Sequence, residues 1–571
     1  MPYIDWMGKK DVVNHHKKIP YKTIECKEEI GELNTSNMII KGDNLLALKS
    51  LLPYYASSVK MIYIDPPYNT GNTSWVYNDN MDSPIIKKWL TKTVNAEDLS
   101  RSDKWLCMMY PRLKLLRELL KDDGVIFISI DDAEVTHLRM ICDEIFGKDN
   151  FVGKFIKQSK VGGGSDSKHI VKEHEYLLIY SKNINNLDEL FMDFDENYLK
   201  RYKDKDEKGY FFWDTFARPG LKNPIKYKIP TPNGDFIDGE WIRSEKRFYE
   251  DYKNGEIKIF QKNDNSWGVH FKQYLNIQGK KPRSLTTDFG GTIEGKNQIK
   301  EIFNDDKIFP YPKASSFIKQ LIHIFSTSKN DIILDSFAGS GTTAHAVLEQ
   351  NALDGGNRKF ILIETMDYAK DITAERVKRV VEGYSFTGKD KTILFEKKLS
   401  TTDILNSKKM QDLSNEANKI IEENSSNFDK IEKTFKENNL KIEGIKDIKG
   451  FKEGLGGGFK YCELGDDIFD ENKELNKNLN FLQIAKHLYF VEFKKPILKD
   501  EIKEPFLGKL EDKYIYFFEK SFKLLDMKNI LKNHSNYKEI IIYTKKTTIS
   551  SQELKKSNIT IRYIPYDIKE N

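Results

Sequence analysis

Four consecutive residues, Asp65-Pro66-Pro67-Tyr68, combine a carboxylate, a rigid turn and an aromatic ring. They follow the apolar run 59–64, which we expect to be a buried strand that the two prolines bring to an end. Asp65 and the Pro66 carbonyl can accept both hydrogens of a conjugated amino group while Tyr68 stacks on its ring. This would favour a tetrahedral nitrogen with a localised lone pair. No strong general base is required, because the proton becomes acidic once the nitrogen carries positive charge. The residues predict group transfer to a planar amine; the alternative is an ordinary strand-ending turn.

A second expected strand, 332–335, runs into the glycine turn Phe337-Ala338-Gly339-Ser340-Gly341-Thr342, which opens a helix. Glycine lets a ligand approach the backbone closely, and a helix start offers N–H donors to a carboxylate. Glu364 ends the following strand, where an acid can accept hydrogen bonds from ribose hydroxyls. Such turns also bind dinucleotides or simply pack tightly. The spacing predicts a nucleoside cofactor, and we expect the two strand ends to form one site.

Two further residues are candidates for ligand contact. Asp43 closes a short strand, where it can contact a ligand or cap the leucine-rich helix that follows. Lys313 ends the stretch Phe309-Pro310-Tyr311-Pro312-Lys313, which reads most simply as a proline-rich helix entry but also places a cation for a carboxylate. His169 and His174 lack a third ligand at metal spacing, so we predict no metal site.

Composition limits the class of protein. The 571 residues are 39% hydrophobic and 31% charged, which is typical of a soluble globular protein of several domains. No apolar run approaches the roughly 18–20 residues of a membrane span, and the cytoplasm is the expected compartment. The net charge of +5 permits a nucleic-acid partner without arguing for one. The cysteines at 26, 107, 142 and 462 are far apart, so we expect four thiols and no disulfide.

Alternating strands and helices predict a mostly parallel sheet covered on both faces. We expect strands at 38–40, 59–64, 124–130, 175–180, 332–334 and 360–364, and helices at 103–120 and 132–146. The rhythm is lost over 183–305, where aromatic and basic residues alternate; this segment is either a decorated surface domain or a domain that contacts DNA. Residues 396–450 are expected to be helical and solvated, and a smaller α/β segment follows the glycine run at 454–458.

The order of the motifs resembles a known family. Asp65-Pro66-Pro67-Tyr68, then an insertion, then the glycine turn at 337–342 is similar to the β class of amino-methylating DNA methyltransferases, in which the catalytic half precedes the cofactor half. Aspartate in place of serine favours adenine N6 over cytosine N4. Further stretches resemble modification subunits of type III restriction systems: 41–44, 64–72, 76–79, 129–132, 309–313, 336–345, 458–461 and 564–567.

The resemblance implies a Rossmann-like, doubly wound, mostly parallel methyltransferase sheet that is circularly permuted. Residues 1–182 would form an N-terminal segment and the catalytic half, and 183–305 an inserted target recognition domain. Residues 306–395 would form the S-adenosylmethionine-binding half. Residues 396–571 would form a helical linker and a smaller C-terminal α/β domain for dimerisation or partner binding.

The resemblance also assigns roles to single residues. Asp65, Pro66 and Tyr68, in the turn that Pro67 completes, would hold a flipped adenine. The residues at the methionine end of S-adenosyl-L-methionine would be Phe337, Gly339, Ser340, Gly341 and Thr342, with Lys313 nearby. Glu364 would bind the ribose, and Asp43 the adenine of the cofactor.

The implied activity is transfer of a methyl group to N6 of adenine in double-stranded DNA, with the base flipped out of the duplex. The protein would be a cytoplasmic homodimer with a restriction subunit as its partner and no membrane contact. Alternatives are cytosine N4 methylation, a non-catalytic DNA-binding assembly subunit, and methylation of RNA or of a protein glutamine.

Overall fold

The computed structural model describes most of the chain, in the ranges 4–33, 35–70, 100–159, 168–217, 220, 223–287, 289–326, 328–436, 438–470, 474–497, 502–534 and 536–564. The chain forms two compact units. One comprises Met1–Asp188 and Arg283–Asn571, and the other comprises Glu189–Pro282. The boundaries of the smaller unit lie inside the insertion expected at 183–305.

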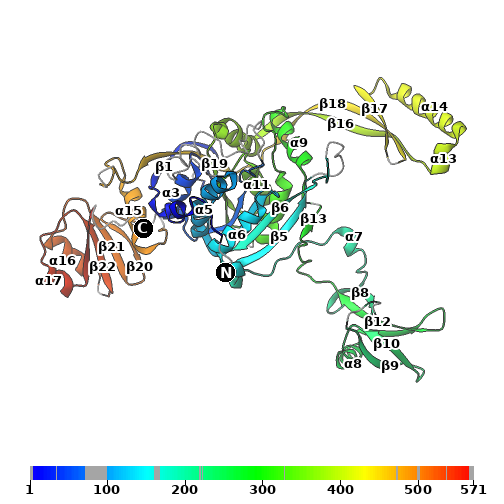
Figure 1. Ribbon diagram of the computed structural model, residues 1–571, viewed down its shortest axis with the longest axis horizontal. Helices are drawn as coiled ribbons and strands as arrows, with labels where there is room; N and C mark the ends of the chain where they lie inside the picture. The colour runs from blue at the N-terminus through cyan, green and yellow to red at the C-terminus, as the bar shows by residue number, and fades with distance from the viewer. Residues whose placement is uncertain are drawn as a thin grey trace. The chain divides into compact units, whose positions relative to one another are not determined.

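A ten-stranded sheet forms the centre of the first unit (Figure 1). Six of its nine neighbouring strand pairs are parallel, which confirms an α/β protein with a large, mostly parallel sheet. Its strands, in spatial order, are β1 (Lys22–Gly31), β19 (Gly458–Asp467), β2 (Met38–Lys41), β15 (Lys359–Glu364), β14 (Ile332–Asp335), β3 (Val59–Ile64), β4 (Leu120–Ile130), β6 (His174–Ser181), β5 (Phe151–Gln158) and β13 (Leu285–Thr286).

Helices cover both faces of this sheet. Alternate residues of β3 and β4, such as Ile62 and Ile126, pack into one core with α3 (Asn44–Tyr55), α5 (Arg101–Leu119) and α6 (Val135–Phe146). Phe127 points the opposite way, against Phe325 of α10 (Ser315–Phe325) at a ring distance of 4.6 Å. Because side chains alternate along a strand, a run of apolar residues at every position requires burial on both sides.

The two strand ends that the sequence singles out are neighbours. β14 pairs with β3 in parallel, with Ile333 opposite Met61 and Leu334 opposite Ile62. Parallel pairing places their carboxyl ends at the same edge of the sheet. The turn after β3 and the turn between β14 and α11 (Thr342–Asp354) therefore face one region, as predicted.

Helix α5 begins two residues before the expected position 103 and contains Pro111 in its interior. The helix begins at Arg101, where Ser100 and Asp103 form a capping box, and it runs through Pro111 to Leu119. A serine with an acid three residues later satisfies two backbone N–H groups that the first turn leaves open, and this outweighs the proline as a start signal.

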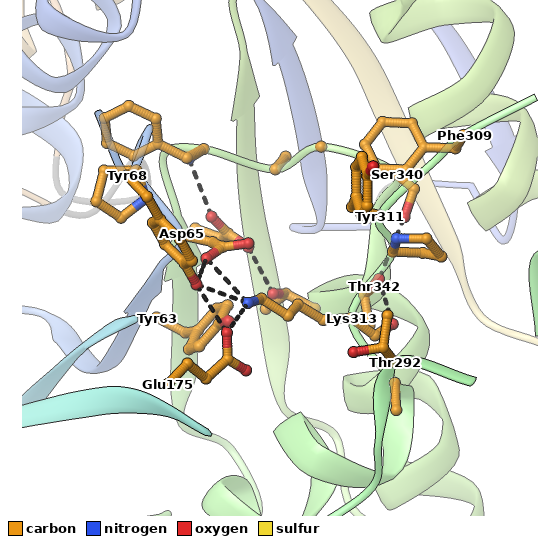
Figure 2. A pocket seen from close by; sticks show the side chains of 18 of the residues that line it. Tyr63, Asp65, Tyr68, Glu175, Thr292, Phe309, Tyr311, Lys313, Ser340 and Thr342 are labelled. Carbon is orange, nitrogen blue, oxygen red and sulfur yellow. Dashed lines mark hydrogen bonds and ion pairs between the residues drawn. The ribbon is translucent and has the colours of Figure 1, made fainter. Parts of the chain in front are cut away.

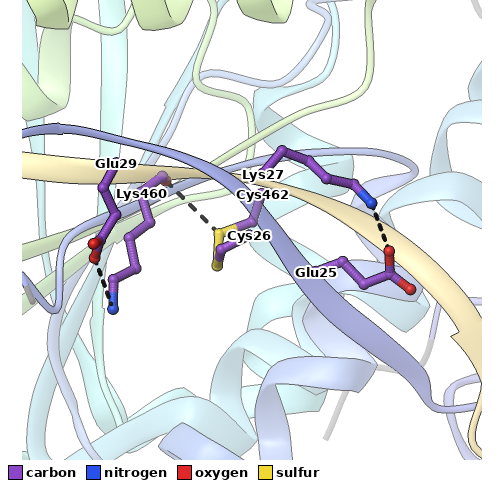
Figure 3. The surroundings of a disulfide bond; sticks show 6 residues. All are labelled: Glu25, Cys26, Lys27, Glu29, Lys460 and Cys462. Carbon is purple, nitrogen blue, oxygen red and sulfur yellow. Dashed lines mark hydrogen bonds and ion pairs between the residues drawn. A yellow bond between two sulfur atoms is a disulfide. The ribbon is translucent and has the colours of Figure 1, made fainter. Parts of the chain in front are cut away.

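Strands β1 and β19 were not expected, and they overturn the expectation of four thiols. Cys26 and Cys462 lie opposite each other in this antiparallel pair and are joined by a disulfide (Figure 3). The expectation was wrong because 436 residues separate the two cysteines, and no local pattern reports a pairing between strands so far apart in the chain. Cys107 and Cys142 are free and buried.

The smaller unit combines two antiparallel sheets. One is four-stranded, in the order β11 (Ile257–Gln261), β12 (Trp267–Tyr274), β8 (Gly209–Thr215), β7 (Asp204–Asp206). The other is the hairpin of β9 (Ile225–Pro230) and β10 (Phe236–Trp241). Phe216, Trp241 and Phe248 centre its own hydrophobic core, together with residues of β12 and of α8 (Glu245–Lys253).

Residues 396–450 are only partly helical. Helices α13 (Thr401–Leu405) and α14 (Ser407–Asn424) lie beside a three-stranded sheet of β16 (Gly383–Lys398), β18 (Asn439–Glu453) and β17 (Lys430–Lys436). The prediction of a helix over β17 and β18 was wrong because it rested on the polar composition of the segment. Only a few of its positions, such as Leu440 and Ile442, are buried apolar residues. Alternation of these two buried positions is the strand signal that was overlooked.

The C-terminal part contains a smaller α/β arrangement, as expected. Its sheet has the order β20 (Phe506–Leu510), β21 (Lys513–Phe518), β22 (Glu539–Thr544), β23 (Ile559–Tyr563). Helix α15 (Phe481–Phe493) packs into one hydrophobic cluster with this sheet. α16 (Leu524–Asn533) and α17 (Ser551–Lys556) contribute to a second cluster.

Two further kinds of feature are absent from the described residues. None of their helices combines the length and apolar character that crossing a bilayer requires. Within the same ranges, no group of three or more His, Cys, Asp or Glu side chains is arranged to hold a metal ion.

Candidate active site

A cavity of about 260 Å³ lies where β3 and β14 end. Nine of the predicted site residues line it: Asp65, Pro66, Pro67, Tyr68, Lys313, Phe337, Gly339, Ser340 and Thr342. Gly341, Glu364 and Asp43 are not among its lining residues. The structure therefore brings the two motifs together in one cavity, and three of the twelve candidates do not belong to its lining.

Two buried side chains hold the Asp65–Tyr68 turn in place. Trp105 of α5 is fully buried and donates its indole N–H to the Pro67 carbonyl at 2.7 Å. Asn69 has a φ of 60° and is also fully buried, and its amide donates to Glu134 Oε1 at 2.5 Å. Because prolines contribute no N–H, the turn depends on such contacts with its carbonyls and with the residue that follows.

Asp65 belongs to a compact network of charges (Figure 2). The Lys313 ammonium lies 3.2 Å from Asp65 Oδ1 and 2.8 Å from Glu175 Oε2, and it donates to the Tyr68 hydroxyl at 2.7 Å. The same hydroxyl lies 2.7 Å from Asp65 Oδ1 and 3.0 Å from Glu175 Oε2. Lys157 binds the other oxygen of Glu175, Oε1, at 2.9 Å. Two ammonium groups thus face two carboxylates.

The network shifts the pKa values of its two acids, Asp65 and Glu175, in opposite directions. Burial raises the pKa of Asp65, and the nearby Lys313 only partly offsets this. Burial acts in the same direction on Glu175, but Lys313 and Lys157 outweigh it and hold the pKa of Glu175 well below its usual value. Burial would lower the pKa of Lys313, yet Asp65 and Glu175 raise it above its usual value. Glu175 and Lys313 are therefore charged at neutral pH, and Asp65 is the acid of this network whose pKa is raised.

The glycine turn is fastened from behind by Glu364. This buried carboxylate accepts N–H bonds from Gly339 at 2.8 Å and from Met366 at 2.9 Å. The Thr373 hydroxyl donates to the Gly339 carbonyl at 2.5 Å. Gly341 has a φ of 79°, and a Cβ on it would meet the Thr373 carbonyl oxygen at 2.9 Å. The turn requires glycine for both its backbone angle and its space.

The residues around this turn fit a nucleoside cofactor with a carboxylate. Aromatic and proline side chains (Phe309, Pro312, Phe337) provide an apolar wall. Two hydroxyl groups (Ser340, Thr342) lie near the start of α11, and that of Thr342 donates to the Lys313 carbonyl. Glu364 accepts a backbone N–H on each oxygen, and a carboxylate is also the group that accepts hydrogen bonds from ribose hydroxyls.

Asp43 caps the helix that follows it, which was the alternative to a ligand contact. Its Oδ1 accepts the N–H groups of Leu45 and Leu46 at 2.9 and 3.1 Å and caps α3. Its Oδ2 lies 3.6 Å from the buried Arg112 guanidinium.

Sequence reasoning missed four acidic or basic residues of the cavity, namely Glu175, Lys157, Asp131 and Asp335. Burial raises the pKa of Asp335 to about 7, and its carboxylate accepts the Thr343 hydroxyl at 2.6 Å and the Phe337 N–H at 3.0 Å. The available signal was the position of these residues in the sequence. Glu175 lies near the start of β6 and Asp335 is the last residue of β14, and both strands are mainly apolar. A charge at such a place must be paired or functional.

The sequence matches a family model whose description is DNA methylase, N6_N4_Mtase, over residues 59–375. This range begins with β3 and ends just after Thr373, whose hydroxyl bonds the Gly339 carbonyl. It therefore contains both motifs and the smaller compact unit. It covers more than half of the 571 residues.

Individual relatives extend the match. The chain is 35% identical over 353 residues to the type III restriction-modification enzyme StyLTI Mod subunit of Salmonella typhimurium, covering 59% of this chain and 53% of that protein. It is 31% identical over 458 residues to the EcoPI Mod subunit of Escherichia phage P1, covering 70% and 69%. It is 32% identical over 361 residues to the type II methyltransferase M.KpnI of Klebsiella pneumoniae, covering 58% and 81%.

The chain thus spans about half the length of the StyLTI subunit and about two thirds of the EcoPI subunit. The matched residues include the whole Asp65–Tyr68 turn, the charged network around it and the glycine turn. On this evidence the chain belongs to the N6/N4 DNA methylase family, with type III Mod subunits among its relatives.

Proposed function

We propose that this protein transfers a methyl group from S-adenosylmethionine to N6 of adenine in double-stranded DNA. The observation that carries the proposal is the single cavity in which Asp65, Pro66 and Tyr68 meet the glycine turn. One part of this cavity suits a planar amine and the other suits a nucleoside cofactor. Relatives named as methyltransferases and Mod subunits support the same reaction class.

The chain's own residues account for the chemistry at the base. Asp65 and the Pro66 carbonyl accept the hydrogens of the exocyclic amino group and favour a tetrahedral nitrogen. Tyr68 stacks on the flipped base, since a paired and stacked base cannot present its amino group in line with a donor. The bound cofactor supplies the methyl group. The negative charge of Asp65 stabilises the positive charge that develops on the nitrogen, which then loses one of its two protons, because that charge makes them acidic.

The cofactor assignments are proposals of the same kind. Phe337, Gly339, Ser340, Gly341 and Thr342 would shape the site for the methionine end, and Glu364 would bind the ribose. Asp43 would reach the cofactor only in addition to its capping role, through oxygen Oδ2. Lys313 remains next to the glycine turn because its carbonyl accepts the Thr342 hydroxyl at 3.2 Å, but its ammonium is on the side of Asp65.

We assign target recognition to the smaller unit, Glu189–Pro282, within the segment 183–305. One face of its four-stranded sheet combines basic and aromatic side chains: Lys258 lies over Trp213 at 5.9 Å, and Lys272, which pairs with Asp206, lies over the buried Phe211 at 4.6 Å. Such a surface can contact phosphates and stack on bases.

The remaining assignments concern the rest of the chain and its surroundings. Residues 1–182 and 306–395 would supply the catalytic and cofactor halves of a permuted, doubly wound methyltransferase sheet. The segment 396–571 would serve dimerisation or binding of a restriction subunit, although its strand β19 belongs to the central sheet. The protein would act in the cytoplasm as a type III Mod subunit.

The test is methyl transfer from radiolabelled S-adenosylmethionine to DNA from cells that lack this protein. Mass analysis of the nucleosides should find N6-methyladenine, and mapping the methylated positions should give a defined target sequence. N4-methylcytosine would contradict the base assignment. DNA that stays unlabelled while the protein is folded and binds the cofactor would favour a non-catalytic assembly subunit.

Replacing Trp105 with phenylalanine tests how far the turn depends on its anchor. Trp105→Phe removes the donor to the Pro67 carbonyl, which should lower the free energy of unfolding by about 1–3 kcal/mol. We expect kcat to fall by about tenfold, because a loosened turn misplaces Asp65. Trp241→Phe is the matched control: it removes a 2.7 Å bond to the Tyr227 carbonyl in the smaller unit, and kcat at saturating DNA should be unchanged. Equal kcat losses in both variants would argue against the anchor role.

A further inference from the structure

The Lys313 ammonium occupies a position that the proposed reaction needs for another group. Its three N–H donors match three oxygens: Asp65 Oδ1, Glu175 Oε2 and the Tyr68 hydroxyl. A protonated amine in tetrahedral geometry that donates to Asp65 is also what the target nitrogen becomes during methyl transfer. The resting site therefore already holds a cation where the reaction generates one.

Lys313 competes with a bound base for the Asp65 carboxylate. The carboxylate must accept the amino hydrogens, and an ammonium at 3.2 Å both competes for the oxygen and neutralises its charge. The side chain is a flexible four-carbon stem with a compact charge, so it can change partners without movement of the backbone. Its own backbone is held by the bond from Thr342 to the Lys313 carbonyl.

Glu175 offers the ammonium another acceptor. Glu175 Oε2 already lies 2.8 Å from Lys313, closer than Asp65 does. Glu175 Oε1 is bound to Lys157, whose ammonium also lies over the Phe317 ring at 4.6 Å, and this fixes the carboxylate from the strand side. Each of these four charged side chains is at most 27% exposed, so an ammonium without a carboxylate there would be costly.

We propose that Lys313 stands in for the amino group of the target base in the resting site, and that Glu175 is the positioning residue that retains the ammonium when the base enters. The inference rests on the proposed methyl transfer to adenine. The exchange moves hydrogen bonds and no covalent bond: Asp65 releases one N–H donor of Lys313 and accepts one from the base. The two carboxylates and two ammonium groups keep a net charge of zero throughout.

The first test is the pH dependence of kcat with DNA that contains the mapped target. We assign to Asp65 the part of the acidic limb that moves in these variants; the charged or titratable groups around it are Glu175, Asp131, Lys157, Lys313, Tyr68, Tyr63 and Asp335, whose own pKa of about 7 contributes to the limb in every variant. Glu175→Gln removes a like charge, so the limb should move to lower pH by about one unit. Lys313→Met removes the opposite charge, so the limb should move to higher pH by a similar amount. Loss of packing alone would reduce kcat at every pH without moving the limb.

The second test measures binding and needs no turnover. Dissociation constants are compared for duplexes with adenine or with purine, which lacks the amino group, at the target position. Comparison of this ratio between protein variants cancels effects that belong to the DNA. In Lys313→Met the preference for adenine should grow by about tenfold over the wild type, because no ammonium competes with the amino group. In Glu175→Gln it should shrink several-fold, because Lys313 has only Asp65 left as an anionic partner.

Glu28→Gln is the control for loss of a glutamate charge. Glu28 lies on β1 and forms an exposed ion pair with Lys370. The substitution should change neither the limb nor the ratio. Methyl transfer by the wild type together with an unmoved limb and an unchanged ratio would overturn this inference and leave the proposed function intact. Absence of methyl transfer in the wild type would overturn both.

Discussion

Replacing Asp65 with alanine should reduce kcat by about 10³-fold or more while the protein still binds cofactor and DNA. The expected loss is large because Asp65 is the only carboxylate of the Asp65–Tyr68 turn, and the stabilisation of developing charge by one preorganised group is worth about 10²–10³ in rate. Removal of Asp65 also leaves Lys313 in the base pocket with Glu175 and Tyr68 as its remaining partners in the network. Single-turnover transfer of labelled methyl groups measures the effect.

The matched control is Asp122→Ala. Asp122 lies on β4 of the same sheet, but it is 73% exposed and pairs with Lys182 at the surface. An exposed ion pair contributes little, so kcat and stability should both be close to the wild type. If Asp65→Ala kept near-normal turnover with an intact fold, the assignment of Asp65 to the amino group would be wrong.

Replacing Gly341 with alanine should weaken cofactor binding by about tenfold or more, or about 1.4 kcal/mol. The substitution places a Cβ 2.9 Å from the Thr373 carbonyl oxygen at a φ of 79°. The backbone must shift, and the shift moves Gly339 and Ser340, which line the cavity. Calorimetry with S-adenosylmethionine measures the affinity, and thermal unfolding measures the stability.

Gly355→Ala separates the effect of space from the effect of backbone angle. Gly355 ends the same helix with a φ of 65°, but a Cβ there would meet nothing within 4 Å. Both variants incur a left-handed backbone cost of about 1–2 kcal/mol. Only Gly341→Ala should also lose cofactor affinity, and equal affinities in the two variants would show that the glycine turn does not shape the cofactor site.

Local sequence was enough to identify the two motifs and the sheet that carries them. The prolines at 66 and 67, the glycines at 339 and 341 and the apolar runs before them impose their conformations within a few residues. Such constraints can be read from neighbouring positions alone. For the same reason β3, β2 and the start of β14 were predicted at nearly their observed bounds.

The tertiary structure decided which side chains from distant segments meet. It placed Glu175 and Lys157 from β6 and β5 beside Asp65, inserted β19 between β1 and β2, and joined Cys26 to Cys462. These contacts depend on the order of strands in the sheet, which is set by packing over the whole unit and leaves no periodic trace in any one segment. The residue types of the Asp65–Tyr68 turn are thus enough to predict the chemistry. The charged side chains around the turn, on which the exchange proposed for Lys313 depends, come together only in the folded chain.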